Sequence, residues 1–233
     1  MKKIIYSLFV CLACTLVSCE GDTTQDVSKI SYFVNFEMKG DPIMQVPVGT
    51  PYVEPGVIAT EGETDITASM VTTGKVDVST IGVYTLSYSA VNVDGFSKST
   101  ERLVVVYNPK ITADMSGSYK VAEGTNRVTD KSGAVKGFSG YKVNISKLAP
   151  GVFEVSDFIA GYYDQGSAYG PAYALKGTMK LNEDNTLSAL DAHLSGWNDS
   201  YTRFEKAMFN PVTGAVNWTV GYSGFTFNVS LTK

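Results

Sequence analysis

The chain has 233 residues and a formal net charge of −4 at pH 7, with 44% hydrophobic and 18% charged residues. This acidic balance and the lack of a basic cluster argue against a nucleic acid partner. No cysteine follows Cys19, which excludes a disulfide framework and thiolate metal sites from most of the chain. The single histidine, His193, excludes zinc sites built on several histidines, so we expect no metal and no other cofactor.

The N terminus has a basic start followed by a short apolar run. Lys2 and Lys3 precede the uncharged segment 4–17, which is shorter than the ~20 residues that a membrane-spanning helix needs. This pattern predicts a signal peptide at residues 1–18. Its end, Leu16-Val17-Ser18-Cys19, resembles the lipobox of bacterial lipoproteins, which implies acylation of Cys19 and anchoring in a membrane. The alternative is an ordinary secretory signal whose last cysteine is incidental.

Residues 19–31 are acidic and polar, and they predict a flexible tether between the lipid and the first domain. Glu20 and the acidic residues behind it resemble a surface-export signal of outer-membrane lipoproteins. The resemblance implies a protein that is lipid-anchored in the outer membrane and exposed at the cell surface. A periplasmic orientation of the same anchor is the alternative.

Short strands separated by turn residues occupy residues 32–108. The clearest strand, 83–91, places Tyr84, Leu86, Tyr88 and Ala90 on one face and mostly polar residues on the other. A period of two with one polar face is typical of a sandwich strand that packs on a core.

Three motifs in this region carry a family resemblance: Gly49-Thr50-Pro51-Tyr52, Ile81-Gly82-Val83-Tyr84 and Asn92-Val93-Asp94-Gly95. They are similar to motifs of the immunoglobulin-like domains of bacterial surface proteins. The resemblance implies a β-sandwich, with Gly82-x-Tyr84-x-Leu86 in the place of the tyrosine corner. Such modules usually space or present other domains.

A second series of strands occupies residues 112–233, after a break at Asn108-Pro109-Lys110. The alternating segments are 116–121, 141–145, 152–155, 177–181, 215–220 and 225–231. They predict an antiparallel β-barrel or sandwich, and pairing of the first and last of these strands would close a barrel. The predicted fold class of the whole chain is therefore all-β.

Tyrosines and glycines crowd into residues 157–173, between two predicted strands, and a second aromatic loop covers 195–201. Aromatic rings offer flat apolar faces to the C–H groups of sugars, and glycines let a ligand approach the backbone. The candidate stacking residues are Tyr162, Tyr163, Tyr169, Trp197 and Tyr201, and the candidate hydrogen-bonding residues are Asp164, Gln165 and Asn198. The alternative is that these aromatics are structural, filling a barrel end or pinning long loops.

A second resemblance covers residues 112–233 and rests on Ser156-Asp157-Phe158-Ile159, Asp184-Asn185-Thr186 and Phe227-Asn228-Val229-Ser230-Leu231. These motifs are similar to an uncharacterised lipoprotein domain family of glycan-foraging Gram-negative bacteria. The resemblance implies a polysaccharide-utilisation system, with a glycan ligand and outer-membrane importer components as partners. The alternative is a structural or adaptor lipoprotein that binds a partner outer-membrane protein.

Acidic residues suited to glycoside hydrolysis occur in the second domain: Asp157, Asp164, Asp191, Asp199 and Glu205. No glycosidase signature surrounds any of them, and the sequence has no nucleophile elbow, phosphate loop or EF-hand loop. We therefore expect a binding protein and not an enzyme.

Overall fold

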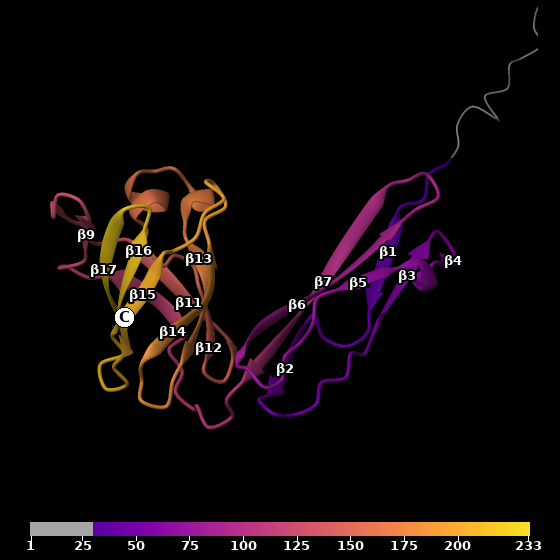
Figure 1. The fold of residues 1–233 in the computed structure, drawn as a ribbon, viewed down its shortest axis with the longest axis horizontal. Coiled ribbons are helices and arrows are strands. Elements are labelled where there is room, and N and C mark those ends of the chain that lie inside the picture. Colours follow the sequence, from indigo (N-terminus) through magenta and orange to yellow (C-terminus); the bar gives the residue numbers. More distant parts are fainter. Residues whose placement is uncertain (1–29) are drawn as a thin grey trace, which may run out of the picture.

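The computed structural model describes residues 30–233, so the expectations for the signal peptide, for Cys19 and for most of the tether lie outside the described residues. Figure 1 shows an all-β chain, which confirms the predicted fold class. None of the helices within residues 30–233 has the length and apolar character needed to span a bilayer.

The N-terminal strands form two facing sheets. One sheet has the order β1 (Val34–Met38), β3 (Val57–Glu61) and β4 (Thr64–Asp65). The other has the order β2 (Ile43–Pro47), β7 (Ser97–Tyr107), β6 (Gly82–Val91) and β5 (Val71–Thr73), and β2 pairs with β7 in parallel. A 3₁₀ turn, η2 (Thr67–Ser69), lies between β4 and β5. This is the expected immunoglobulin-like sandwich.

Strand β6 has the face predicted from its sequence. Leu86, Tyr88 and Ala90 are buried, and Tyr84 is half-buried at the start of the strand. The Tyr84 hydroxyl donates a 2.8 Å hydrogen bond to the carbonyl of Thr80, four residues upstream, which is the geometry of a tyrosine corner. The barrel has the same device, because the Tyr119 hydroxyl donates to the carbonyl of Met115 at 2.7 Å.

The remaining strands form one antiparallel sheet that curls into a barrel-like shape (Figure 1). Along the described chain they are β8 (Gly117–Val121), β9 (Asn126–Thr129), β10 (Val135–Gly137), β11 (Lys142–Ala149), β12 (Val152–Val155), β13 (Lys176–Leu181), β14 (Leu187–His193), β15 (Arg203–Phe209), β16 (Val216–Tyr222) and β17 (Phe225–Thr232). Neighbours along the chain pair from β11 to β14 and from β15 to β17. The β9–β10 hairpin is added to the edge of β17.

The first and last strands of the barrel pair as expected. Leu231 lies opposite Val121 and Thr232 opposite Lys120, which joins β17 to β8. On the other side, a bridge between Thr186 and Met208 brings the start of β14 to β15. The long segment between β12 and β13 then covers one end of the curled sheet (Figure 1).

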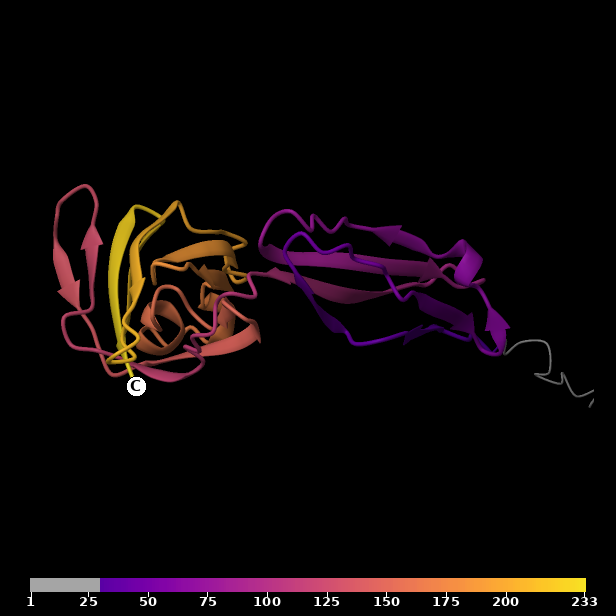
Figure 2. The same cartoon turned by 90° about the horizontal axis from the view of Figure 1, so that it is seen from below.

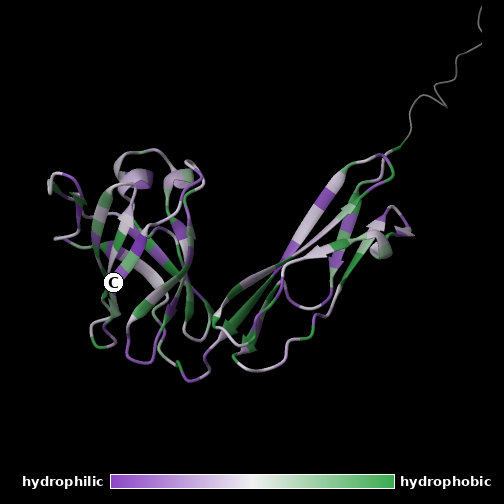
Figure 3. Cartoon of the chain, viewed as in Figure 1, coloured by the Kyte–Doolittle hydropathy of each residue, from purple (hydrophilic) through white to green (hydrophobic). Residues whose placement is uncertain are grey.

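Side chains on the inner face of this sheet form a continuous core that includes Phe153, Trp218 and Phe227, each at most 1% exposed. Figure 3 shows hydrophobic and hydrophilic residues alternating along the strands, the pattern of a sheet with one buried face. The Trp218 indole donates a 2.7 Å hydrogen bond to the carbonyl of Phe158, which ties the covering segment to the core.

A small apolar cluster joins the sandwich to the barrel. Val105 of β7 packs with Ala149 and Val152, which flank the β11–β12 turn. The Gln45 amide also donates a 2.7 Å hydrogen bond to the carbonyl of Leu148. The two parts lie end to end (Figure 2). Residues 32–108 and 112–233 remain our proposed domain boundaries.

Candidate functional site

A buried carboxylate organises the segment between β12 and β13. Asp157 is 1% exposed and accepts three backbone hydrogen bonds, from the N–H groups of Ile159 at 2.9 Å, Gly161 at 2.7 Å and Leu175 at 2.9 Å. Because Ile159 and Leu175 stand near opposite ends of the segment, one side chain holds both ends together. Asp157 is therefore not a solvated surface acid, and both of its oxygens are engaged by backbone donors of the segment.

We expect Asp157 to make the stability of the barrel depend on pH. Burial raises the pKa of its carboxyl from 3.8 to about 7, although three backbone donors favour the charged form. Between about pH 4 and pH 7 the folded protein then holds a proton that the unfolded chain releases, so the free energy of unfolding falls as pH rises through that window. Denaturant titrations at several pH values measure the slope.

The control for this prediction is Asp157→Asn. The amide does not titrate, so the part of the slope due to this residue disappears. Its nitrogen also cannot accept a hydrogen bond from a backbone N–H, which adds a loss of about 1–3 kcal/mol at every pH. An identical pH slope in wild type and variant contradicts the assignment.

Two short helical turns shape the rest of the segment: η3 (Tyr162–Gly166), a π-helical turn, and η4 (Pro171–Tyr173), a 3₁₀ turn. Gly161 precedes η3 with φ +76°, and a Cβ there would lie 2.9 Å from Tyr141. The Gln165 amide accepts a hydrogen bond from the backbone N–H of Lys142 at 3.0 Å and donates one to its carbonyl at 2.8 Å. Both polar ends of Gln165 thus dock the segment on β11.

The 195–201 loop contacts this segment directly. The Gly196 N–H donates a 2.7 Å hydrogen bond to the carbonyl of Ala172, and the Ser195 hydroxyl donates to the same carbonyl at 3.2 Å. A Cβ at Gly196 would lie 2.7 Å from the Tyr173 ring, so only glycine permits this approach without a shift. The contact brings Trp197 next to the tyrosines of the other loop.

Five rings form a connected group that we call the aromatic platform: Tyr163, Tyr169, Tyr173, Trp197 and Tyr222. Trp197 meets Tyr163 and Tyr173 edge to face, each with ring centroids 4.9 Å apart. Tyr169 lies parallel to Tyr163, with centroids 6.3 Å apart and planes 4° apart. Tyr169 is 56% exposed and Trp197 44%, so the platform reaches solvent through these two rings.

The other sequence-predicted residues take different positions around the platform. Tyr162 is 7% exposed and packs in the core against Phe138 and Phe227. Tyr201 is half-buried and also packs on the barrel core. Asn198 is exposed at the tip of its loop with φ +51°, and Asp164 is half-buried within η3.

Sequence reasoning missed three residues of this region: Tyr173, Tyr222 and Arg127. The Arg127 guanidinium lies 4.2 Å from the centre of the Phe225 ring and 5.2 Å from that of Tyr162.

Burial raises the pKa of Tyr163, and the positive charge of Arg127 partly offsets this. Burial, with the negative charge of Asp199 beside it, raises the pKa of Tyr222 to about 12. In β16, Tyr222 lies two and four residues after the buried Val220 and Trp218, so the alternation of this strand predicts that it points to the same face.

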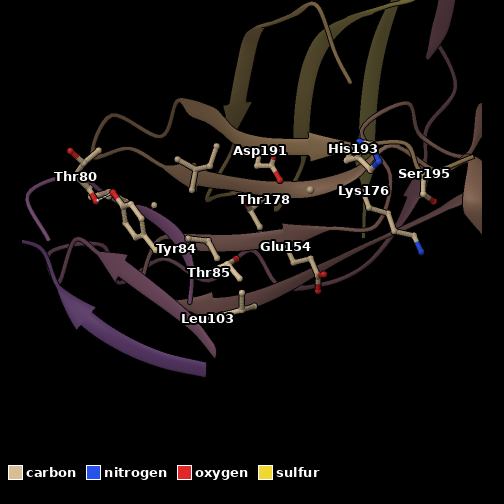
Figure 4. A pocket seen from close by; sticks show the side chains of 15 residues that line it. Thr80, Tyr84, Thr85, Leu103, Glu154, Lys176, Thr178, Asp191, His193 and Ser195 are labelled. Carbon is tan, nitrogen blue, oxygen red and sulfur yellow. Dashed lines mark hydrogen bonds between the residues drawn. The ribbon is translucent and has the colours of Figure 1, made fainter. Parts of the chain in front are cut away.

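A separate groove of about 680 Å³ lies between the sandwich and the barrel. Figure 4 shows Glu154, Thr178 and Asp191 on barrel strands along this groove, with Tyr84, Thr85 and Leu103 contributed by the sandwich. His193 lines the same groove. Within residues 30–233, no three metal-binding side chains of the histidine, cysteine or carboxylate type gather at one point.

Two family models match the chain. A model described as a C-terminal domain matches residues 108–233, and the model for the Ig-like domain of bacterial surface proteins matches residues 36–106. The crystal structure of the lipoprotein BT2262 from Bacteroides thetaiotaomicron shares 42% sequence identity over 86% of this chain and 100% of its own, with a TM-score of 0.49. The chain belongs to this family of bacterial lipoproteins. The sequence identity and the family models, and not the superposition, carry that assignment.

The family assignment confirms both resemblances read from the sequence, and it makes this protein a cell-envelope lipoprotein. No functionally curated protein shows significant sequence similarity to it.

Two structures of Clostridium perfringens ZmpB are also similar. CBM51-2 in complex with GlcNAc and INT domains shows 16% identity over 57% of this chain and 34% of its own, with a TM-score of 0.27. The M60 catalytic domain with CBM51-1 and CBM51-2 shows 14% identity over 55% and 14%, with a TM-score of 0.29.

Proposed function

We propose that this lipoprotein is anchored through Cys19 in the outer membrane, faces the cell surface and binds an oligosaccharide or polysaccharide through the aromatic platform. The observation that carries the proposal is the exposure of Tyr169 and Trp197 side by side, with ring centroids 6.1 Å apart. Large aromatic rings are usually buried when they serve only packing. Here two of them stand on adjoining loops, where binding residues are commonly found.

The chemistry of the surroundings suits a sugar. The C–H faces of pyranose rings pack on aromatic faces, while their hydroxyl groups need donors and acceptors at the edge of the stack. Of the predicted hydrogen-bonding residues, Asn198 and Asp164 directly follow the platform residues Trp197 and Tyr163 in the chain. In this proposal Tyr163 and Tyr173 support the exposed rings, and Tyr162, Gln165 and Tyr201 hold the scaffold.

A glycan array followed by calorimetry on the soluble mature chain, residues 20–233, tests the proposal. We expect binding of at least one class of oligosaccharide without shortening of the ligand over time. Shortening would reveal a catalytic carboxylate pair and overturn the non-enzymatic assignment. Absence of binding across plant, microbial and host glycans would remove the glycan proposal altogether.

One observation favours a second candidate, an adaptor that binds an outer-membrane protein such as an importer component. The β9–β10 hairpin projects from the barrel, and β10 is an edge strand whose Val135 is 67% exposed (Figure 1). Edge strands with free backbone groups pair readily with strands of other chains. Cross-linking in intact cells, with and without Val135→Lys, distinguishes a partner at this edge from a glycan at the platform.

The anchoring part of the proposal has its own test. Mass spectrometry of the N-terminal peptide is expected to show acyl chains on Cys19, and Cys19→Ser is expected to release the protein from the membrane fraction. Protease shaving of intact cells then separates the two faces of the outer membrane. Protection of the chain until lysis would place it in the periplasm.

A further inference from the structure

Exposed apolar side chains gather at the end of the sandwich where the described chain begins. We call them the apolar tip: Ile30, Tyr32, Phe33, Val91, Val93 and Phe96. Their exposed fractions run from 53% for Phe96 to 74% for Val93. Scattered exposed apolar residues are ordinary on soluble proteins, but a group of this size on one end of a domain marks an interaction surface.

The tip is a built structure. The Phe33 and Phe96 rings contact each other with centroids 5.6 Å apart. Asn92, which is 4% exposed, donates a 2.8 Å hydrogen bond to the carbonyl of Tyr32 and accepts one from the N–H of Phe96 at 2.7 Å. The Glu61 carboxylate accepts from the N–H of Val93 at 3.1 Å. These bonds hold the β6–β7 turn and the incoming chain against each other. The apolar side chains are therefore already ordered, and little conformational entropy is lost when the tip binds a partner.

The position of the tip indicates which partner it contacts. It lies at the end of the molecule far from the aromatic platform (Figure 1). Cys19 precedes Ile30 by eleven positions in the sequence. At ~3.3–3.6 Å per residue, a fully extended chain of that length spans at most about 40 Å. An acyl group on Cys19 therefore keeps the tip within about 40 Å of the bilayer surface.

We propose that the apolar tip inserts into the headgroup region of the bilayer that holds the anchor. This inference rests on the proposed acylation of Cys19. Aromatic and aliphatic side chains on a turn are the groups that bind at membrane interfaces. The Glu61 carboxylate, bound to the N–H of Val93, puts a negative charge beside the tip, which favours a zwitterionic lipid surface over an anionic one. Two points of attachment, the acyl group and the tip, fix the orientation of the sandwich, while the barrel lies at the other end of the molecule (Figure 1).

Tryptophan quenching by brominated lipids tests the contact. In the chain 19–233, Cys19 is the single cysteine, so it can be coupled to a maleimide lipid in phosphatidylcholine vesicles whose acyl chains carry bromine. Phe96→Trp adds a probe at the tip. We expect brominated lipid to reduce its emission and to shift it toward the blue, because bromine quenches only at contact.

The chain supplies its own controls. The native tryptophans, Trp197 and Trp218, both lie in residues 112–233, and wild type coupled in the same way is expected to show no quenching. Val212→Trp places a more exposed probe on a turn of the barrel, where Val212 is 92% exposed, and it should also stay unquenched. Adding Ile30→Ser and Phe33→Ser to Phe96→Trp is expected to abolish the quenching while circular dichroism stays unchanged.

Three outcomes overturn the inference: Phe96→Trp emission equal to that of Val212→Trp, quenching of both probes alike, or a lipid-independent blue shift with dimers in sedimentation. The last outcome would assign the tip to a second copy of the chain. Because the tether is attached chemically, these results do not depend on whether cells acylate Cys19. Failure of the proposed anchoring and failure of the tip contact are therefore seen in separate experiments.

Discussion

Arg102→Ala is expected to destabilise the immunoglobulin-like sandwich by about 3–5 kcal/mol, because it removes the fully buried partner of an ion pair. The Arg102 side chain is fully buried, and its Nε lies 3.0 Å from Oε1 of Glu54. The guanidinium also donates to the carbonyls of Lys39, at 2.6 Å, and Asp41. The loss would leave a carboxylate and two carbonyls without their charged donor.

The ionisation of Glu54 depends on Arg102 and on the other hydrogen-bond donors around it. Burial raises the pKa of its carboxyl, but hydrogen bonds from Tyr52 and Gly56 and the charge of Arg102 lower it below the ordinary value overall. Glu54→Gln keeps the size and part of the hydrogen bonding while it removes the charge. We expect it to destabilise the sandwich less than Arg102→Ala does, because Arg102 keeps its carbonyl acceptors.

Denaturant unfolding followed by tryptophan emission and by circular dichroism distinguishes the stability of the sandwich from that of the barrel. Both tryptophans lie in the barrel half, so tryptophan emission follows barrel unfolding and circular dichroism follows both halves. Arg203→Ala is the matched control, because Arg203 is 42% exposed and pairs with Asp130 at 4.0 Å and Glu205 at 3.6 Å. Exposed pairs of this kind contribute at most about 1 kcal/mol. A loss of similar size for the two arginine variants would show that the buried Arg102 does not hold the sandwich together.

Trp197→Ala and Trp218→Ala are expected to separate binding from folding. Trp197 is 44% exposed in the platform, so its loss should weaken glycan affinity at least about tenfold, or about 1.4 kcal/mol, with little change in stability. Trp218 is 1% exposed and packs on Phe158 and Phe204. Its replacement by alanine should cost about 3–5 kcal/mol of folding free energy.

Calorimetry with the glycan found on the array measures the first effect, and denaturant unfolding measures the second. Tyr163→Ala is an intermediate case, because this half-buried ring supports both exposed rings, and it should lower affinity and stability together. If Trp197→Ala destabilises the barrel and leaves affinity intact, the platform is a structural closure of the barrel end.

Local pattern was enough to predict the strands with one clean apolar face. The alternation of Leu86, Tyr88 and Ala90 predicts β6, whereas the tyrosine corner at Tyr84 was implied by the resemblance to immunoglobulin-like domains. The pairing of the first and last barrel strands also followed, because each carries an inward row of large apolar residues. In a sheet with one buried face, every second residue of a strand is apolar, so such strands can be predicted from the sequence without tertiary information.

Strands without that period were missed. In β9 every residue is half-buried and in β10 every residue is exposed, so neither has a clear inner face. Strand β15 contains a register shift between Glu205 and Met208, with Lys206 at φ +51°, and this bulge breaks the alternation of its side chains. Their pairing partners, and not their own residues, define these strands.

The sequence alone determined an all-β lipoprotein with an immunoglobulin-like first half, and it located the aromatic loops. Only the tertiary structure decided which rings belong together. Tyr162 and Tyr163 are neighbours in the sequence, yet the π-helical turn sends the first into the core and the second to the platform. Trp197 joins them because the curled sheet, the buried Asp157 and the close approach at Gly196 bring two distant loops into contact. Contacts of that kind depend on chain closure over long separations, which no local period records.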